Sequence, residues 1–417
     1  MQKQVFKPGK DYLPVSGKVY NQAEIKAGIQ AVRDGWWTEG RFAKKFELQL
    51  AQFLGVDYVT LVNSGSSANL LALYALTAPE LKERQLKPGD EFITTSLAFP
   101  TTVNPGVMYG LKPVFIDASL DDFNIDTQQI EAAITSKTKL IMVAHTLGRP
   151  FNLEKIQQLC RQHNLWLIED SCDALGSEFK NQKIGSFGDL ATFSFYPAHQ
   201  LTMGEGGAVV TKNPRLHRIL RQFRDWGRDC WCDPGHDNTC GRRFNWQLGE
   251  LPKGYDHKYI YSKIGFNLKL TDMQAAIGLA QLEKLPRFIQ ARQRNYHYLY
   301  SFFSKYPELF ILPVEQSDAV ISYFGFPLIV KPTAPFTRNQ LTQYLESKKI
   351  GTRNIFAGNL LRHPAYLNLK KKRVVGKQLV ADQMMNQGFW LGVWPGLNLT
   401  HLRFITQTLS QFINLYF

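Results

Sequence analysis

The chain has 417 residues, of which 44% are hydrophobic, and a formal net charge of +14. This length predicts roughly two to three domains. The hydrophobic fraction is high enough for sizeable buried cores and excludes a disordered chain. The apolar runs are too short to cross a membrane, and the N-terminus lacks the apolar core of a signal peptide, so we expect a cytoplasmic protein without a membrane partner. Positive charge alone would suit a nucleic-acid binder, but no nucleic-acid motif accompanies it, and we expect no such partner.

The first half of the chain alternates short apolar runs with helical segments. Residues 1–20 form a polar arm, and two helical patterns follow at 21–34 and 41–54, each closed by a glycine. Further helical segments are expected at 66–78, 126–134 and 152–164. Apolar strand candidates lie at 58–62, 92–96, 113–117, 140–145, 165–170, 190–195 and 208–211. This alternation predicts an α/β fold with a seven-stranded, mostly parallel sheet flanked by helices. The last two strands are too close in sequence for a crossover helix and should pair antiparallel.

The second half begins with an irregular stretch. Residues 224–263 are rich in tryptophan, glycine, arginine and cysteine, show no clear period, and are interpreted as a functional insertion. A helix is predicted from Thr271 to Leu285, with Thr271 as its N-cap and Pro286 just past its end. We therefore expect an arm (1–20), a large domain (21–285) and a smaller C-terminal α+β domain (286–417).

A serine-rich turn lies between the first predicted strand and its helix, with Ser66 and Ser67 at the helix start. Hydroxyl and backbone N–H groups at a helix N-terminus hold a phosphate well. The structural alternative is an ordinary serine cap, which is common. On its own this turn does not decide between the two.

Polar groups also follow later strands. Asp170 ends a strand, where a carboxylate can pair with a protonated pyridine nitrogen or simply lie in a solvated loop. Phe99 follows another strand and would lie against a ring or belong to the core. Ser194 ends the strand before a polar loop that contains His199 and closes with a glycine turn. Such loops between buried strands often carry reactive groups.

Taken in order, these motifs resemble the fold-type I sugar aminotransferases of the DegT/DnrJ/EryC1/StrS family, which use pyridoxal phosphate. The stretch from Gly265 to Ala276 fits the same pattern, and the resemblance covers about residues 20–410. It implies that Ser66, Ser67 and Ser194 hold the cofactor phosphate and that Asp170 holds the pyridine nitrogen. It also implies that Asn267 reaches the phosphate of a neighbouring subunit, so that the active unit is a homodimer.

The position of the cofactor lysine in that family is occupied by His199. Without a lysine amine no covalent link to the cofactor forms there. The loop therefore resembles a branch of 3-dehydrases that hold pyridoxamine phosphate non-covalently and remove the C3 hydroxyl of nucleotide-linked 4-keto-6-deoxyhexoses. The resemblance implies that His199 abstracts the C4′ proton, a task that suits a side chain partly neutral at pH 7. The alternative is a purely structural histidine.

Other residues near this loop receive weaker assignments. Asp173 and Tyr196 lie close to His199 by the motif and would tune its proton or contact the sugar. Arg403 is a candidate contact for the substrate diphosphate.

Four of the five cysteines follow the spacing C-x57-C-x-C-x7-C, namely Cys172, Cys230, Cys232 and Cys240. This spacing resembles the [2Fe–2S] pattern of a 3-dehydrase, and four thiolates complete such a cluster. Zinc takes the same donors, so the residues alone leave both metals open. Cys160 falls within a predicted helix and is interpreted as a packed thiol.

The resemblance as a whole implies a homodimeric enzyme that makes a 3,6-dideoxyhexose precursor for lipopolysaccharide O-antigen or a glycosylated natural product. Electrons would come from a separate NAD(P)H-dependent flavin and iron–sulfur reductase. Three alternatives stay open. They are an aminotransferase that uses another lysine, a dehydratase without a cluster, and a non-enzymatic metal-binding regulator on this fold.

Overall fold

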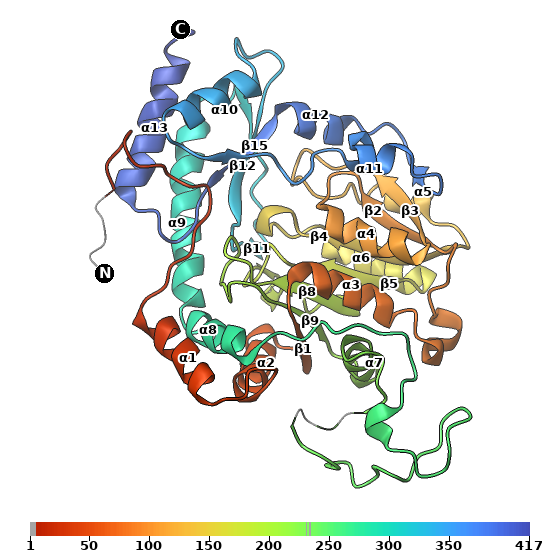
Figure 1. The fold of residues 1–417 in the computed structure, drawn as a ribbon. Coiled ribbons are helices and arrows are strands. Elements are labelled where there is room, and N and C mark those ends of the chain that lie inside the picture. Colours follow the sequence, from red (N-terminus) through yellow and green to blue (C-terminus); the bar gives the residue numbers. More distant parts are fainter. Residues whose placement is uncertain (1–5, 231, 233–234) are drawn as a thin grey trace.

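The computed structural model describes residues 6–230, 232 and 235–417. Its centre is an eight-stranded sheet in the order β1-β9-β8-β5-β4-β2-β3-β14 (Figure 1). The pairs from β8 through β14 are parallel, whereas β9 runs antiparallel to both β8 and β1. The strands are β1 (Tyr58–Val62), β2 (Glu91–Thr95), β3 (Lys112–Ile116), β4 (Thr138–Ala144), β5 (Trp166–Asp170), β8 (Leu190–Ser194), β9 (Gly207–Thr211) and β14 (Arg373–Val374).

The predicted α/β sheet is confirmed, with two differences. All seven strand candidates form strands, and β8 and β9 pair antiparallel as expected. The eighth strand, β14, comes from the C-terminal part of the chain and pairs with β3. Its two residues are too few to produce a periodic signal. A second antiparallel pair, β1 with β9, adds to this prediction. The short connection to β8 reverses the direction of β9, and β9 therefore also runs antiparallel to its other neighbour, β1.

Both faces of the sheet are covered by helices, and the alternation of side chains along β4 shows how. Leu140 and Met142 belong to a core under α3, α4 and α7, while Ile141 and Val143 belong to a core under α5 and α6. Near β1, β8 and β9, that second face is covered by α2 and α8. These helices are α2 (Arg41–Leu54), α3 (Gly65–Ala75), α4 (Pro100–Tyr109), α5 (Ile130–Ala133), α6 (Leu153–His163), α7 (Pro214–Arg224) and α8 (Asp272–Leu282). A parallel sheet buried on both faces explains why its strands read as continuous apolar runs.

Most of the predicted helices are present, and one is much shorter than expected. The two N-terminal patterns form α1 (Gln22–Arg33) and α2, and Thr271 caps α8 through a capping box. The segment 126–134 is helical only in α5, because the Asp126 carboxylate accepts from the backbone N–H of Gln128 and holds a turn there. Pro286 belongs to the first turn of the next helix, α9 (Leu285–Phe303), where proline is well tolerated.

The C-terminal part builds a second, antiparallel sheet in the order β10-β12-β15-β13. Its core packs against the long helix α9 and against α10 and α13, and Figure 1 shows α9 running beside this sheet. A three-stranded sheet, β11-β6-β7, completes the topology. These elements are β6 (Glu178–Phe179), β7 (Gln182–Lys183), β10 (Phe310–Ile311), β11 (Ala319–Val320), β12 (Gly325–Val330), α10 (Arg338–Ser347), β13 (Thr352–Arg353), α11 (Pro364–Leu367), α12 (Leu379–Gln387), β15 (Gly388–Gly392) and α13 (Leu399–Ile413). Among the residues that the structure describes, no helix combines the length and apolarity needed to cross a membrane.

The stretch between α7 and α8, which the sequence predicts to be irregular, has little regular structure in its described residues. Within its described residues the one helical turn is the short 3-10 helix η3 (His257–Tyr259). Backbone bridges join Asp225 to Asn267 and Arg228 to Tyr261, so the two ends of the insertion lie side by side. Figure 1 shows the insertion projecting from the body of the molecule beyond α7. It is therefore a separate loop region attached at a narrow base.

Candidate active site and metal centre

A cavity of about 450 Å³ lies between the two sheets, at the ends of β5 and β8. The cavity is lined by Cys172 and by six residues that the sequence predicted to contact the cofactor or the sugar, namely Ser66, Phe99, Asp170, Asp173, Ser194 and Tyr196. His199 lines it as well. A larger cavity, of about 810 Å³, lies against α2 and α7 and contains none of these residues. The convergence of motifs far apart in sequence identifies the smaller cavity as the candidate active site.

Asp170 is held in place by donors from two helices. Its Oδ2 atom accepts hydrogen bonds from Asn69 Nδ2 (2.8 Å) on α3 and from Thr102 Oγ1 (2.7 Å) on α4. Asn69 is itself oriented by Thr192, whose hydroxyl donates to its Oδ1 atom at 2.6 Å. These hydrogen bonds fix the direction of the carboxylate. The arrangement suits a partner for a protonated ring nitrogen.

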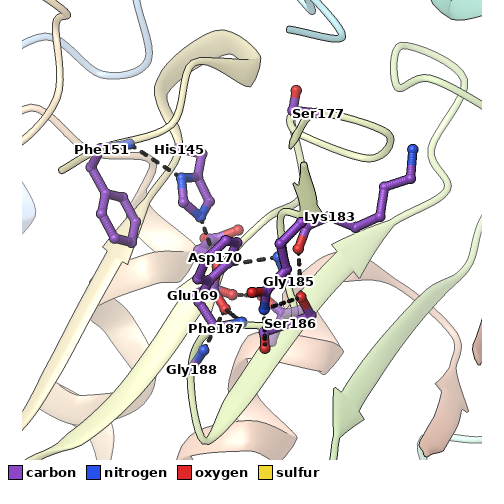
Figure 2. A network of polar contacts seen from close by, with 12 residues as sticks. His145, Phe151, Glu169, Asp170, Ser177, Lys183, Gly185, Ser186, Phe187 and Gly188 are labelled. Carbon is purple, nitrogen blue, oxygen red and sulfur yellow. Dashed lines mark hydrogen bonds and ion pairs between the residues drawn. The ribbon is translucent and has the colours of Figure 1, made fainter. Parts of the chain in front are cut away.

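Behind Asp170 lies a buried network that sequence reasoning missed (Figure 2). Glu169 is fully buried, and its Oε2 atom lies 3.1 Å from Nε2 of His145, which also lines the cavity. The same carboxylate accepts from the backbone N–H groups of Gly185, Phe187 and Gly188 at 3.1, 2.9 and 2.6 Å. A buried charge with this many donors is compensated. The network joins the ends of β4 and β5 to the loop before β8.

The start of α3 meets the end of β8 closely enough to form a phosphate cradle. Ser64 caps α3, and its Oγ atom accepts from the backbone N–H of Ser67 at 3.1 Å. A methyl group on Gly65 would come within 2.4 Å of Ser194 Cβ, so only glycine allows this approach. Ser66 and Ser194 line the cavity, whereas the Ser67 hydroxyl donates to Asn63 at 2.6 Å. The free N–H groups of a helix start beside two serine hydroxyls fit a phosphate.

His199 pairs with a buried carboxylate. Its Nδ1 atom lies 3.4 Å from Oδ1 of Asp173, and both side chains are largely buried. Burial raises the pKa of Asp173, an effect opposed by His199 and by the charge of Arg292. The guanidinium of Arg292 also donates to the backbone carbonyls of Ala198 (3.3 Å) and His199 (2.9 Å). With Nδ1 directed to Asp173, Nε2 is the nitrogen left to exchange a proton with a ligand.

The mouth of the cavity carries aromatic and basic side chains, several of which the sequence did not reveal. Phe99 and Tyr196 are each 51% exposed. Phe324 lies 5.2 Å from His199 and 5.4 Å from Trp390, measured between ring centroids, and Trp390 also lines the cavity. Arg353 is a further lining residue. No motif marks these positions, because they reach the cavity only through the packing of the second sheet on the first.

Besides Ser67, two residues that the sequence predicted to bind cofactor or substrate do not line this cavity. Asn267 is exposed at the base of the insertion, where its side chain accepts from Lys269 Nζ at 2.7 Å. Arg403 is exposed on α13 and does not line the cavity, while Arg353 does. The exposure of Asn267 is what a contact to a neighbouring subunit requires.

The structure brings three of the four predicted cysteine ligands together, around a histidine. Nε2 of His257 lies 3.2 Å from Cys230 Sγ and 3.7 Å from both Cys232 Sγ and Cys240 Sγ. One ligand atom from each of Cys230, Cys232 and His257 lies within 4.8 Å of the others. Cys172 instead lines the candidate active site, where burial raises the pKa of its thiol.

The thiols differ in how readily they ionise. Burial opposes ionisation of Cys232, but hydrogen bonds, first from Thr239 and then from the Cys240 backbone, lower the pKa of its thiol to about 6. Burial raises the pKa of Cys160 to about 12. Cys160 lies buried in α6, as the sequence predicted. Burial also raises the pKa of the Cys230 thiol, so these shifts do not single out the insertion cysteines as a group. Their grouping around His257 is what makes them the candidate metal ligands.

The fold and the cavity together are those of a fold-type I enzyme, with a pocket that suits pyridoxal or pyridoxamine phosphate and contains His199. The chain belongs to the DegT/DnrJ/EryC1/StrS aminotransferase family, which it matches over residues 19–410. It is 52% identical to the lipopolysaccharide biosynthesis protein RfbH of Salmonella typhimurium, over 99% of this chain and 94% of the relative. It is 46% identical to dTDP-4-dehydro-2,6-dideoxy-D-glucose 3-dehydratase of Saccharopolyspora spinosa, over 98% of this chain and 88% of the relative.

A solved structure shares the whole fold. The E. coli GDP-4-keto-6-deoxy-D-mannose-3-dehydratase with bound hydrated PLP matches with a TM-score of 0.86 and 29% identity, covering 96% of this chain and 99% of that one. The likeness includes both sheets, because the match extends over almost all of each chain.

Proposed function

We propose that this protein removes the C3 hydroxyl of a nucleotide-linked 4-keto-6-deoxyhexose, CDP-4-keto-6-deoxy-D-glucose, with pyridoxamine phosphate as cofactor. The observation that carries the proposal is His199, paired with Asp173, in the loop position where the family pattern has the cofactor lysine. A site that cannot hold the cofactor covalently, yet keeps a base beside it, suits elimination and not amino transfer. Two relatives named as sugar 3-dehydratases support the same reaction class.

The residues of the cavity fit the cofactor, and each would have one task. Pyridoxamine phosphate would supply the amine for the C4 ketone and an electron sink. Asp170 would hold the ring nitrogen, and Ser66, Ser194 and the start of α3 would hold the phosphate. His199 would take the C4′ proton on its Nε2 atom and return it to the leaving hydroxyl group, while Asp173 holds the opposite nitrogen.

Substrate contacts would come from the mouth of the cavity. Arg353 is the basic side chain that lines it, and we assign the diphosphate to Arg353 in preference to Arg403. Phe99 would cover one face of the cofactor ring, and Tyr196 would contact the sugar. Asn267 would complete the phosphate site of a neighbouring subunit in a homodimer.

Replacement of the C3 hydroxyl by hydrogen requires two electrons and two protons, and it releases water. We assign the transfer of these electrons to an iron–sulfur cluster held by the cysteines of the insertion, since such clusters carry one electron at a time. An NAD(P)H-dependent flavin and iron–sulfur reductase would be the donor. In the cytoplasm the product would serve as a 3,6-dideoxyhexose precursor, and the similarity to RfbH supports O-antigen synthesis as its destination.

The test combines a spectrum with a product analysis. Anaerobically purified protein should show the pyridoxamine band and iron–sulfur bands together, and borohydride should leave no cofactor attached to the chain. Given CDP-4-keto-6-deoxy-D-glucose, NADH and a reductase, it should form the 3-deoxy sugar. Formation of a 4-amino sugar with glutamate, or a cofactor-labelled lysine peptide, would refute the proposal in favour of an aminotransferase.

A further inference from the structure

The cysteines of the insertion surround one imidazole, and this contact is tighter than packing requires. His257 is 1% exposed, although histidine is seldom fully buried without a polar partner. Its Nε2 atom is within 3.7 Å of all three insertion sulfurs. With metal–sulfur bonds of about 2.3 Å and metal–nitrogen bonds of about 2.0–2.1 Å, a tetrahedral ion places sulfur and nitrogen about 3.5 Å apart. The observed distances bracket this separation.

The backbone holds His257 in this position from both sides. Its N–H group donates to the carbonyl of Arg243 at 3.0 Å, and its own carbonyl accepts from Ile260 at 3.1 Å. Arg243 is in turn fixed to Asp256, the residue before the histidine, by an ion pair of 2.6 Å. The ring of Trp246 lies 5.4 Å away, edge to face. Metal-binding histidines are typically oriented by such a surrounding shell.

The Cys230 side of the group is anchored as well. The backbone N–H of Asp229 donates to the carbonyl of Ile260 at 2.8 Å. The Asp229 carboxylate accepts from Gln222 (2.7 Å) and Arg218 (3.1 Å) on α7. These contacts tie Cys230 and the segment after His257 to the same end of α7. The fold thus positions both Cys230 and His257 next to the place where a metal would bind.

We propose that His257 is the fourth protein ligand of the metal centre, with Cys230, Cys232 and Cys240, and that Cys172 is a residue of the cofactor pocket. This inference rests on the proposed function and refines its metal site. A set of three thiolates and one imidazole binds a single zinc ion, which is the arrangement that these distances fit. Imidazole also replaces thiolate on iron in some [2Fe–2S] centres, and in such a centre the ligands of the second iron would lie farther from Nε2 than the sulfurs do in this structure. Cys172 lies instead beside Gly65 and Ser194, at the phosphate end of the cavity.

The test measures metal bound to five anaerobically reconstituted proteins: wild type, His257→Ala, His257→Cys, Cys172→Ser and the control His236→Ala. His236 is an exposed histidine of the same insertion. We expect bound metal in His257→Ala to fall below about a tenth of the wild-type content, because one of four ligands is lost. His257→Cys, Cys172→Ser and His236→Ala should retain it. Far-UV circular dichroism and urea unfolding of each variant check that the fold is intact.

A second readout identifies the metal and its nitrogen ligand. Iron with acid-labile sulfide, and a ¹⁵N coupling in the pulsed EPR of protein labelled with ¹⁵N-histidine that vanishes in His257→Cys, supports both the ligand set and the reductive reaction. Zinc that is lost only in His257→Ala supports the ligand set but refutes the cluster of the proposed function. Retention of metal by His257→Ala overturns the inference, and so does its loss from Cys172→Ser.

Discussion

The candidate active site and the cysteine insertion are built in opposite ways. In the active site, polar groups from strand and helix ends bond across the molecule, as Asp170 does to α3 and α4. In the described part of the insertion, contacts are mainly local, and regular structure is limited to one 3-10 turn. The candidate active site is a cavity between the two sheets, whereas Figure 1 shows the insertion extending from the surface beyond α7.

This difference teaches where stability comes from in each region. The pocket is stabilised by the cores of the two sheets and needs no ligand to fold. The insertion buries few apolar side chains, and Phe244, Tyr259 and Tyr261 are each more than half exposed. Binding of the proposed metal would therefore contribute directly to the order of the insertion, because such a site is absent in the unfolded chain.

Separating the two regions by mutation should give the largest effect. Cys230→Ser should form no 3-deoxy product with reductase and NADH, because no cluster is left to carry electrons. The same variant should still exchange the C3 hydroxyl with ¹⁸O from solvent, since elimination uses only the pocket. Mass spectrometry of recovered substrate and product measures both reactions. Full product formation would show that the cysteines are structural.

The converse variant should disable the pocket and spare the insertion. His199→Asn should lower the rate of ¹⁸O exchange by about 10²–10⁴-fold, the usual contribution of a general base. Its visible iron–sulfur spectrum and its affinity for pyridoxamine phosphate should match the wild type. An unchanged exchange rate would remove His199 from the reaction.

Replacing Asp173 tests whether this carboxylate increases turnover while it lowers the stability of the fold. Asp173→Asn should lower turnover by about 10–100-fold, as expected for a group that orients an essential histidine. Because burial raises the pKa of Asp173 above its ordinary 3.8, the folded protein keeps its proton longer than the unfolded chain as pH rises. The ionised carboxylate thus costs stability that Asn does not. In urea unfolding, the free energy of unfolding of the variant minus that of the wild type should rise as pH increases from the unfolded-state pKa to the folded-state pKa of Asp173. At higher pH this difference should stay constant.

Replacing Glu169 tests how much the buried network behind Asp170 contributes to the free energy of unfolding. Glu169→Gln keeps the shape but loses the charge that three backbone N–H groups and His145 share. We expect the free energy of unfolding to fall by about 1.5–3 kcal/mol, the usual contribution of a hydrogen bond to a charged group. Thr271→Ala, which removes a helix cap outside the pocket, is a matched control with an expected loss of about 1 kcal/mol. Equal losses would mean that the network adds nothing beyond local structure.

The smallest effect concerns the substrate. Arg353→Ala should raise KM for the nucleotide sugar by about tenfold, the value of one charged hydrogen bond to a diphosphate. Arg403→Ala should leave KM unchanged, because Arg403 lies outside the cavity. Steady-state kinetics with both variants distinguishes the assignments, and the reverse pattern would restore Arg403.

The sequence predicted what is encoded locally. Strand ends place a residue at the sheet edge whatever the rest of the chain does, so Asp170 and Ser194 could be assigned to the pocket in advance. His145 and Arg353 could not be assigned in this way. His145 belongs to the site through its contact with the buried Glu169, and Arg353 reaches the cavity only because the second sheet packs on the first. Cysteine spacing identified the insertion but not His257, because a loop without a period gives no information on which side chains converge.

Arg292 has a consequence for motion. It is fully buried on α9, and besides the carbonyls of Ala198 and His199 it donates to those of Tyr323 (3.0 Å) and Phe324 (3.1 Å), just before β12. Each hydrogen bond from a charged donor contributes about 1.5–3 kcal/mol, so sliding the second sheet past the loop of His199 would break several at once. The base therefore travels as one rigid body with the second sheet. Any hinge that narrows the cavity must bend elsewhere in the chain.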